Sequence, residues 1–434
     1  MLREKRLRIL VTALLAATTG CLFLPEAGAQ AAYKILHTFK GGTKDGSFPQ
    51  SGVILDSAGN LYGTTPYGGA YGYGMVYKLT PRTTGAWSET VLHSFNNNGH
   101  DGLSSYSGLV FDPQGNLYGT AYYGGNGPCT TGQFPGCGTV FELSPKAQGG
   151  WGYKIIHTFE AGADGAWPSA ALIVGPDGSL YGTTSSGGLG GCSIGGYVGC
   201  GTVFELTPSN GGWTETVLHS FDGGADGEFL GGGLTQDAEG NLYGSTLNGG
   251  SSGCTGNIGC GTVFELALSG GSWNKTRLYT FTGGADGEMP VGSLILDGAG
   301  NLYGATVEGG RDGTGTVFEL TNSSGVWTET VLHSFCAYPN CNGGEGPFTG
   351  VVFDGAGNLY GTARNGAIGN VDGVVYKLTP NAKSGWKETV LRKFYNNPSG
   401  QPYSGVTFDG AGNLYGTTGG DNIATFGTVY ELTP

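Results

Sequence analysis

Short runs of alternating apolar and polar residues, separated by glycine-rich turns, recur along the chain after residue 30. The most regular run reads Asn-Leu-Tyr-Gly six times and Ser-Leu-Tyr-Gly once. Its copies begin at Asn60, Asn116, Ser179, Asn241, Asn301, Asn358 and Asn413. A period of roughly 60 residues filled with strand-like segments is the pattern of a repeat architecture. The sequence therefore predicts seven copies of one structural unit.

Each unit contains four strand candidates bounded by turn residues. In the second unit they span residues 108–112, 116–120, 138–143 and 151–159. Four short antiparallel strands in a repeating unit are typical of a β-propeller, whose radial repetition leaves only short, protected edges. We therefore predict an all-β fold, a seven-bladed β-propeller with four antiparallel strands per blade. The unbroken repeat argues for a single domain over residues 30–434.

The two ends of the repeat region predict how the ring closes. Residues 33–39 copy a fourth strand with no unit before them, and the chain ends on a copy of a third strand at residues 427–432. We expect the N-terminal strand to complete the last blade. Both ends of the repeat region would then lie in one sheet.

Residues 1–29 differ from the repeats and predict a signal peptide. Arg3, Lys5, Arg6 and Arg8 precede an apolar run at residues 9–24, and Ala27-Gly28-Ala29 fits a cleavage site. The run is too short for a comfortable membrane span. We expect export without a transmembrane span, to the extracellular space or the periplasm. Cys21 after Gly20 raises a lipid anchor as the alternative.

Charge and motif content exclude several classes of protein. The net charge is −13, with only 12% charged residues, which argues against nucleic acid or an anionic membrane as the partner. No zinc-protease, nucleophile-elbow or phosphate-loop motif occurs. The sequence leans away from an enzyme and names no catalytic residue, metal site or cofactor. We expect a monomer.

Most recurring side chains have a structural interpretation. The Asp-x-x-Gly segments read as type I turns, and the tyrosines of the tetrapeptides as packing between blades. Five histidines share one repeat position, where we expect a hydrogen-bonding role. Small residues open each innermost strand, where seven strands would converge on one axis. They are Gly52, Gly108, Ala171, Gly233, Ser293, Gly350 and Gly405.

The candidate ligand site lies on one face of the predicted ring. In a propeller, the loops from fourth to first strands and from second to third strands share a side, which we call the loop face. Its repeated Gly-Gly-x-Asp-Gly segments carry acids, with aromatic residues close behind. The candidates are Asp45, Phe48, Asp101, Asp164, Trp167, Asp226, Phe229, Asp286, Glu345 (at a shifted spacing) and Tyr403.

Acids beside aromatic rings suit a polyhydroxylated ligand, which would use hydroxyl hydrogen bonds and ring stacking. They also suit Ca²⁺, which prefers oxygen ligands. The alternative is that each Asp caps its own turn while each aromatic ring fills the axis. Sequence alone leaves these alternatives open.

Eight cysteines follow the predicted signal peptide in four close pairs: Cys129 and Cys137, Cys192 and Cys200, Cys254 and Cys260, and Cys336 and Cys341. An exported chain favours disulfides over metal binding, and the short separations favour local pairing. All four pairs are expected in loops of the loop face.

The repeat unit itself resembles a known family. Asp-x-x-Gly-Asn-Leu-Tyr-Gly-Thr-Thr, followed by Gly-Gly and then Gly-Thr-Val-Phe-Glu-Leu-Thr, resembles the GloVer tandem repeat of secreted bacterial proteins over residues 33–434. The resemblance implies an exported repeat protein without an activity to carry over. The unit is more loosely similar to NHL-type and streptogramin-lyase-like propellers, whose catalytic residues have no matching motif here.

Two functions stay open at this point. The first is an extracellular recognition module that binds a glycan or a protein through the loop face. The second is a hydrolase or lyase that uses loop carboxylates, with or without Ca²⁺. Fold alone does not choose between them, because one propeller architecture carries unrelated functions.

Overall fold

The computed structural model describes residues 31–131, 134–194, 197–250, 253–254, 258–336, 343–366, 371–383, 385–395, 400–420 and 425–434. The expected signal peptide with its cleavage site, and the alternative lipid anchor at Cys21, lie outside these ranges. Among the described residues, no helix has both the length and the apolar character needed to cross a bilayer.

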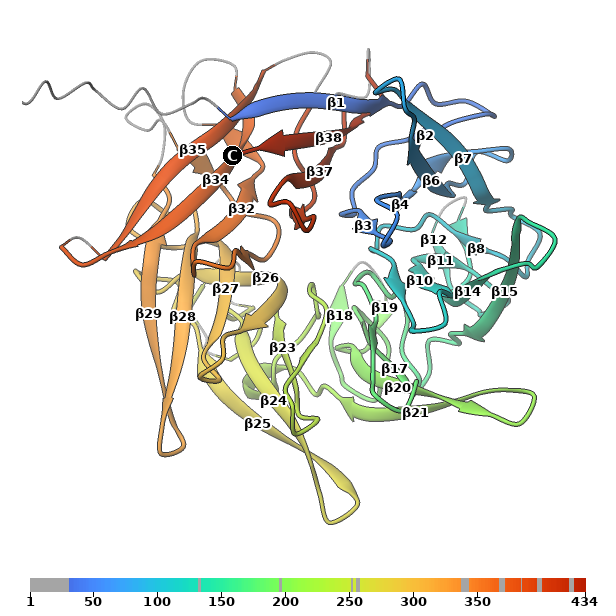
Figure 1. The fold of residues 1–434 in the computed structure, drawn as a ribbon. Coiled ribbons are helices and arrows are strands. Elements are labelled where there is room, and N and C mark those ends of the chain that lie inside the picture. Colours follow the sequence, from blue (N-terminus) through green and yellow to red (C-terminus); the bar gives the residue numbers. More distant parts are fainter. Residues whose placement is uncertain are drawn as a thin grey trace, which may run out of the picture. The chain divides into compact units, whose positions relative to one another are not determined.

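The described residues form seven four-stranded antiparallel sheets arranged radially around a central opening (Figure 1). We number the blades 1 to 7 along the chain and their strands from the axis outward. The first strands are β3 (Ile54–Leu55), β9 (Val110–Phe111), β16 (Ile173–Val174), β22 (Thr235–Gln236), β26 (Glu288–Leu296), β31 (Val352–Phe353) and β36 (Thr407–Phe408). The second strands are β4 (Leu61–Thr65), β10 (Leu117–Ala121), β17 (Leu180–Thr184), β23 (Leu242–Thr246), β27 (Leu302–Glu308), β32 (Leu359–Ala363) and β37 (Leu414–Thr418).

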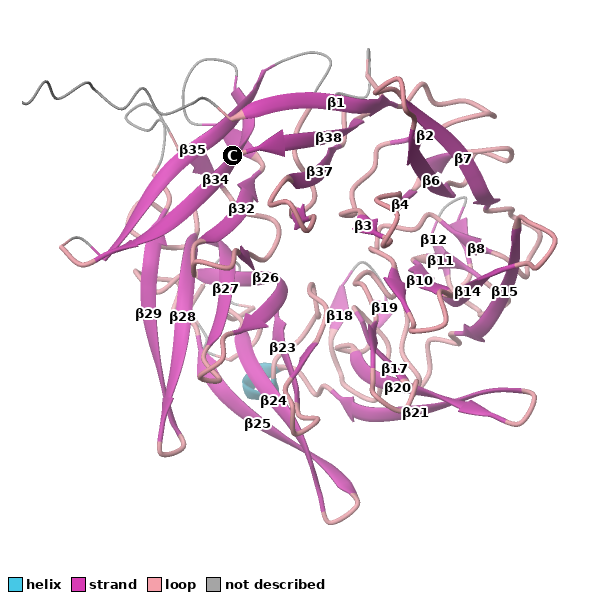
Figure 2. Cartoon of the chain, in the orientation of Figure 1, coloured by secondary structure: helices cyan, strands magenta, loops and turns pink. Residues whose placement is uncertain are grey.

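The outer half of each blade is a long hairpin. The third strands are β6 (Met75–Pro81), β14 (Thr139–Pro145), β20 (Thr202–Ser209), β24 (Thr262–Ser269), β28 (Thr316–Ser323), β34 (Val371–Asn381) and β38 (Thr428–Thr433). The fourth strands are β7 (Trp87–Ser94), β15 (Trp151–Thr158), β21 (Gly212–Ser220), β25 (Ser272–Thr280), β29 (Val326–Ser334), β35 (Gly385–Tyr395) and β1 (Ala32–Thr38). The helical part of the described chain is one 3₁₀ turn, η1 (Gly224–Asp226) (Figure 2).

The N-terminal strand closes the ring, as predicted. The sheet of blade 7 has the order β1-β38-β37-β36, and β1 runs antiparallel to β38 from Ala32 opposite Thr433 to Thr38 opposite Thr428. Figure 1 shows β1, in blue, beside the red C-terminal strands. The two ends of the repeat region therefore share one sheet.

Neighbouring blades are joined by the tyrosines of the repeated tetrapeptide. The Tyr62 hydroxyl donates to Asp56 Oδ2 at 2.9 Å, which satisfies its one polar atom. Its ring packs edge-on against Phe111 and Trp151 of blade 2, with ring centroids 5.1 and 6.0 Å apart. The expected interblade packing with a satisfied hydroxyl is confirmed.

The glycine of the tetrapeptide is required by the packing within each blade. A Cβ atom at Gly119 would lie 2.6 Å from Phe141 Cζ, a separation that packed atoms do not tolerate. Phe141 comes from the third strand of the same blade and is fully buried. The missing side chain on the second strand therefore makes room for the large aromatic residue of the third strand.

Candidate functional site

Two sets of loops meet on the loop face. Each fourth-to-first loop pairs with the second-to-third loop of the blade that follows it. The pairs are β2 (Gly46–Ser47) with β5 (Tyr67–Gly68), β8 (Gly102–Leu103) with β11 (Tyr123–Gly124), and β30 (Gly344–Glu345) with β33 (Asn365–Gly366). Bridges between Ala166 and Ser186 and between Glu228 and Asn248 continue the pattern. The prediction that both loop sets share one face is confirmed.

One equivalent loop position on this face has a left-handed backbone in blades 1 to 6. It is occupied by Phe48, Ser104, Trp167, Phe229 and Met289, with φ between 54° and 59°, and by Gly346, with φ of 62°. Bulky residues rarely adopt this conformation, which costs on the order of 1–3 kcal/mol. Repetition around the ring shows that the conformation belongs to the fold and is not a local accident.

Hydrogen bonds between blades hold these residues in place. Each amide donates to a carbonyl in the second-to-third loop of the preceding blade, at 2.7–2.9 Å for blades 1 to 6. The Trp167 amide, for example, donates to the Cys137 carbonyl at 2.8 Å. Sequence reasoning missed this role, although Phe48, Trp167 and Phe229, each three positions after a loop Asp, marked the place.

Three of the four expected disulfides are present in the described part of the chain. They join Cys129 to Cys137, Cys192 to Cys200 and Cys254 to Cys260. The fourth expected pair includes Cys341, which lies outside the described residues. Local pairing in the second-to-third loops is therefore confirmed for three pairs, and it is typical of proteins that fold in an oxidising compartment.

The second cysteine of each pair also anchors the next blade. The carbonyls of Cys137, Cys200 and Cys260 accept the amides of Trp167, Phe229 and Met289 at 2.8–2.9 Å. Because each disulfide closes a loop of six to eight residues around that carbonyl, it fixes the acceptor of an interblade bond. The cross-links therefore order the loop face beyond their own loops.

Reduction of the disulfides is expected to loosen this face without unfolding the blades. Each small ring contributes about 2–3 kcal/mol by the chain-entropy argument, whereas none of the three cross-links joins strands of a blade sheet. Amide hydrogen exchange should rise at residues 167, 229 and 289, and the circular dichroism of the strands should persist. Loss of the strand signal on reduction would contradict this expectation. Non-reducing peptide mapping should recover the three local pairs.

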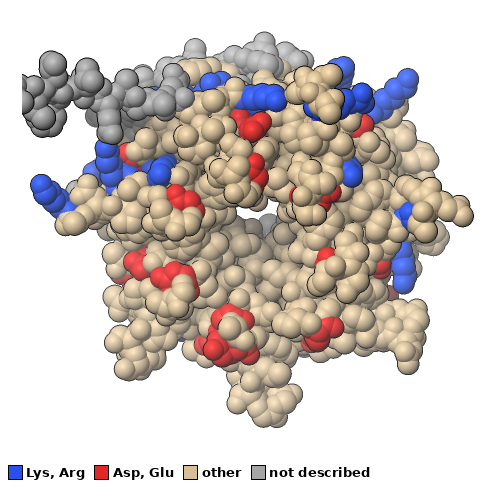
Figure 3. Space-filling view, viewed as in Figure 1, with Lys and Arg blue, Asp and Glu red and all other residues tan. Residues whose placement is uncertain are grey.

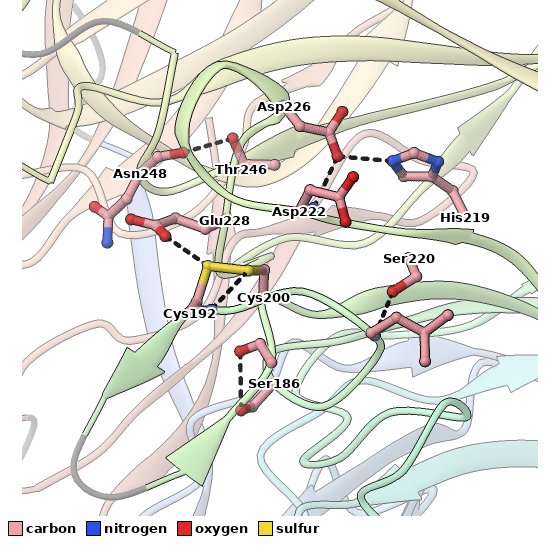
Figure 4. The surroundings of a disulfide bond; sticks show 12 residues. Ser186, Cys192, Cys200, His219, Ser220, Asp222, Asp226, Glu228, Thr246 and Asn248 are labelled. Atoms are coloured by element: carbon pink, nitrogen blue, oxygen red, sulfur yellow. Dashed lines mark hydrogen bonds and ion pairs between the residues drawn. A yellow bond between two sulfur atoms is a disulfide. The ribbon is translucent and has the colours of Figure 1, made fainter.

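The loop acids hold their own loops. Asp45, Asp101, Asp164, Asp226 and Asp286 each accept a backbone amide four or five residues earlier, at 2.8–3.0 Å. Each also faces the fourth-strand residue at the histidine position. Nε2 of His219 lies 3.0 Å from Asp226 (Figure 4). Nε2 of His93 lies 2.9 Å from Asp101, and the Tyr279 hydroxyl donates to Asp286 at 3.1 Å. These contacts match the capping alternative, and the hydrogen-bonding role of the histidine position is confirmed there.

A third side chain, from the fourth strand of the following blade, completes each cluster. At Asp226 it is Lys275, whose Nζ lies 2.6 Å from the Oδ1 atom. At Asp101 it is Tyr153, which donates to the carboxylate at 2.6 Å and stacks on His93. At Asp45, Asp164 and Asp286 it is a glutamate, respectively Glu89, Glu215 and Glu329. The third member of these equivalent clusters is therefore a cation, a neutral donor or an acid, depending on the interface.

Where glutamate is the third member, two carboxylates face each other in a half-buried cluster. Burial and then the nearby Asp164 raise the pKa of Glu215 to about 7. Burial and Asp286 do the same for Glu329, whose pKa is also about 7. The pKa of Asp226 is shifted in the opposite direction. Burial alone would raise this pKa, but the hydrogen bonds from His219 and Lys275 outweigh the effect of burial and hold the pKa well below its usual value.

The sixth blade departs from the spacing that the sequence suggested for Glu345. The strand register places Gly343 at the position of Asp45, and Glu345 at the position of Ser47. A Cβ atom on Gly343 would lie 2.7 Å from the Glu388 carboxylate. Glu388 therefore fills the space of the missing acid and faces His333 at 3.8 Å.

Two groups of side chains bring metal-ligating atoms within 4.8 Å of one another in the described chain. The first is His37, Asp45 and Glu89, at the interface of blades 7 and 1. The second is Glu228 beside the disulfide of Cys192 and Cys200 (Figure 4), where the sulfur atoms are already bonded to each other. Neither group includes more than one residue of the expected Ca²⁺ candidates.

The central opening of the ring contains a cavity of about 360 Å³. All seven small residues that open the innermost strands line it, which confirms their predicted position on the axis. Figure 3 shows the hollow at the centre of the ring. Three aromatic residues from fourth-to-first loops also line it: Tyr106, Phe348 and Tyr403. Phe348 is 39% exposed.

The remaining aromatic candidates support this cavity from the side. Trp167 is only 7% exposed and stacks on Tyr122, with ring centroids 6.0 Å apart. Phe48 packs edge-on against Tyr67, whose hydroxyl lies 3.1 Å from that of Tyr106. Aromatic contacts thus run from blade 1 to blade 3 behind the cavity wall. Direct contact between Trp167 and a ligand would require the side chain to move.

A second hollow, of about 420 Å³, lies on the opposite face between blades 6 and 7. Asp354 and Asp409 of the Asp-x-x-Gly turns line it. Both carboxylates accept several hydrogen bonds within their own turns, for example from Asn358 and Asn413. This hollow therefore offers a ligand few unused acceptors.

Solved structures that resemble this one share its overall fold at low identity. A fungal alcohol oxidase in complex with copper matches with a TM-score of 0.55 and 13% identity, covering 93% of this chain and 76% of that chain. A Lactobacillus plantarum protein matches with a TM-score of 0.49, 15% identity and coverage of 83% and 88%. A Dyadobacter fermentans protein of unknown function matches with a TM-score of 0.47, 11% identity and coverage of 92% and 99%.

The similarity to the alcohol oxidase, at 13% identity, supports the overall fold and carries no chemistry to this chain. A comparison with curated protein sequences found no match. The model of the Gloeobacter/Verrucomicrobia repeat, in contrast, matches residues 15–256 and 189–430, which together span most of the sequence. The chain belongs to the Gloeobacter/Verrucomicrobia repeat family.

Proposed function

We propose that this protein is an exported recognition module that binds carbohydrate at the loop-face end of its central cavity. The observation that carries the proposal is the composition of the cavity wall, where Tyr106, Phe348 and Tyr403 accompany backbone and hydroxyl groups. Aromatic faces stack on sugar rings, and hydroxyl groups exchange hydrogen bonds with them. A cavity of about 360 Å³ is within the usual range of small-ligand sites.

The state of the loop acids favours binding over hydrolysis or lyase chemistry. A catalytic acid or base must reach the substrate with a free lone pair or proton. Asp101 and Asp226 instead accept backbone amides of their own loops and face histidines of the preceding fourth strands. The proposal therefore uses the acids as loop supports and the aromatic residues as the contact surface.

The disulfides and the expected signal peptide support a secreted location, extracellular or periplasmic. Ca²⁺ is not required by the proposal, since the loop carboxylates are already hydrogen-bonded in this structure. A protein partner instead of a glycan is an outcome that the experiment below separates.

The test is a glycan array with the mature protein, followed by titration calorimetry on the best glycan, with and without Ca²⁺. The double variant Phe348→Ala, Tyr403→Ala should lose at least tenfold in affinity, because two stacking surfaces disappear. Tyr71→Ala is the matched control, an aromatic residue that is 55% exposed and does not line the cavity. Binding by the double variant at the level of the control would contradict the proposed site. Binding to no glycan at all would contradict the proposed function.

A further inference from the structure

Arg364 carries a positive charge beside the central cavity. It directly follows β32, at the start of the second-to-third loop of blade 6. Its guanidinium carbon lies 5.0 Å from the ring centroid of Phe348 and 4.4 Å from that of Tyr403. Both rings line the cavity. The cation is thus held between two residues of the proposed contact surface.

Hydrogen bonds fix one edge of this guanidinium. Nε donates to Gln401 Oε1 at 3.0 Å, and Nη2 donates to the Tyr403 hydroxyl at 2.7 Å. The Tyr403 hydroxyl in turn donates to Gln401 Oε1 at 2.9 Å. An arginine side chain has five N–H donors in a fixed fork. Two are used here, and the three remaining include the pair on Nη1.

No carboxylate of the described residues lies within ion-pair distance of Arg364. Lys275 and Arg311, in contrast, each have such a partner, in Asp226 and Asp312. In a chain of net charge −13, a cation that is held by aromatic rings and neutral groups keeps its charge available to a ligand. Arginine suits this task because its planar fork matches a carboxylate with two parallel hydrogen bonds.

We propose that Arg364 binds the carboxylate of a uronic acid residue in a carbohydrate chain, while Phe348 and Tyr403 contact the sugar rings. This inference rests on the proposed function and specifies its ligand class as an acidic glycan. The pre-ordered guanidinium lowers the entropic cost of binding, because the side chain does not have to be immobilised by the ligand.

The experiment compares three sets of oligosaccharides by titration calorimetry. They are oligouronates, the same chains with their carboxyl groups reduced to alcohols, and chains that have sulfate groups but no carboxyl groups. The wild-type protein should bind at least one oligouronate ten times more tightly than its reduced counterpart. Arg364→Gln should abolish this preference, so that the oligouronate and its reduced counterpart bind with equal affinity. Arg364→Lys should restore only part of it, because an ammonium group does not form the planar fork.

Two controls separate the possible failures. Arg311→Gln removes an exposed arginine paired with Asp312 and should leave the preference intact. The melting temperature of each variant shows whether it is folded. Equal binding of acidic and reduced chains by the wild type would overturn this inference and leave the proposed function standing, as would a preference for the sulfated chains. Absence of binding to every chain would overturn both.

Discussion

Removing residues 31–40, which contain β1, is expected to prevent the protein from forming a stable ring. The deletion leaves β38 as an unpaired edge in blade 7, and an open edge strand is a site of aggregation. It also removes Leu36 and Phe39, which are 8% and 2% exposed. Phe39 packs against Tyr77 of blade 1 at 5.1 Å, and Tyr33 packs against Phe394 of blade 6 at 6.0 Å. Three blades therefore lose contacts at once.

Loss of a single buried phenylalanine costs about 3–5 kcal/mol, so the full deletion should exceed the marginal stability of a typical domain. Size-exclusion chromatography should show aggregated protein. Any monomer that remains should bind a hydrophobic dye, as measured by fluorescence. The milder variant Phe39→Ala should remain folded with a clearly lowered melting temperature. The control deletes Gly270 and Gly271 from the exposed turn between β24 and β25, with little expected effect. A deletion variant as stable as this control would show that β1 does not close the ring.

The architecture could be predicted from the sequence because every unit repeats the same local information. Strand pattern, turn residues and period agree seven times, so an error in one unit is corrected by the others. The last unit lacks a fourth strand and the repeat region begins with an extra one, so the N-terminal strand is identified as the strand that closes the ring. The small residues on the axis, such as Gly108 and Gly233, follow from the same geometry because seven strands converge there.

The polar clusters between blades could be predicted only in part. The histidine at the end of a fourth strand and the aspartate in the loop that follows lie seven or eight residues apart, as in His93 and Asp101, so their pairing could have been found from the sequence. The third member lies about 50 positions away on the next blade, and no local pattern orients it. Lys275 and Tyr153 were therefore missed.

The sequence predicted which face of the ring carries the contact surface, but not which residues of that face line the cavity. The sequence grouped Tyr403 with Phe48 and Trp167, yet the two loop positions differ. Phe48 and Trp167 lie four residues before the small residue that opens the innermost strand, whereas Tyr106, Phe348 and Tyr403 lie two residues before it. The three aromatic residues at the later position line the cavity. Arg364 gave no sequence signal, because its partners come from a different blade and a different loop.

The stability of the protein is expected to be highest in mild acid and to fall as the pH rises toward 7. Glu215 and Glu329 have pKa values of about 7 in the folded protein, against an ordinary value of 4.5. Between these values the folded state retains protons that the unfolded chain has released. Stability is therefore lost with rising pH over this interval, and the loss is complete above about pH 7.

Other groups make the folded protein less stable as the pH falls, and they limit its stability in acid. Burial, and then the charge of Arg311, lowers the pKa of His333 to about 4, so folding increasingly disfavours its protonation below about pH 6.5. The lowered pKa of Asp226 contributes stability that is lost as the pH falls below its ordinary value of 3.8. The three glutamates with a pKa of about 7, Glu89, Glu215 and Glu329, should outweigh the two histidines with a lowered pKa, His157 and His333, between pH 4.5 and 7, so the optimum is expected near pH 5.

The variant Glu215→Gln, Glu329→Gln tests this balance, because an amide keeps the shape of the side chain and removes the charge. After allowance for solvent screening, each substitution should stabilise the protein by about 1 kcal/mol at pH 8. The melting temperature should then rise by about 2–3 °C at pH 8 and stay unchanged near pH 4.5. Glu239→Gln, in an exposed turn, is the control and should leave the pH profile as it is. If the double variant kept the wild-type slope between pH 5 and 8, the paired carboxylates between blades would not be its cause.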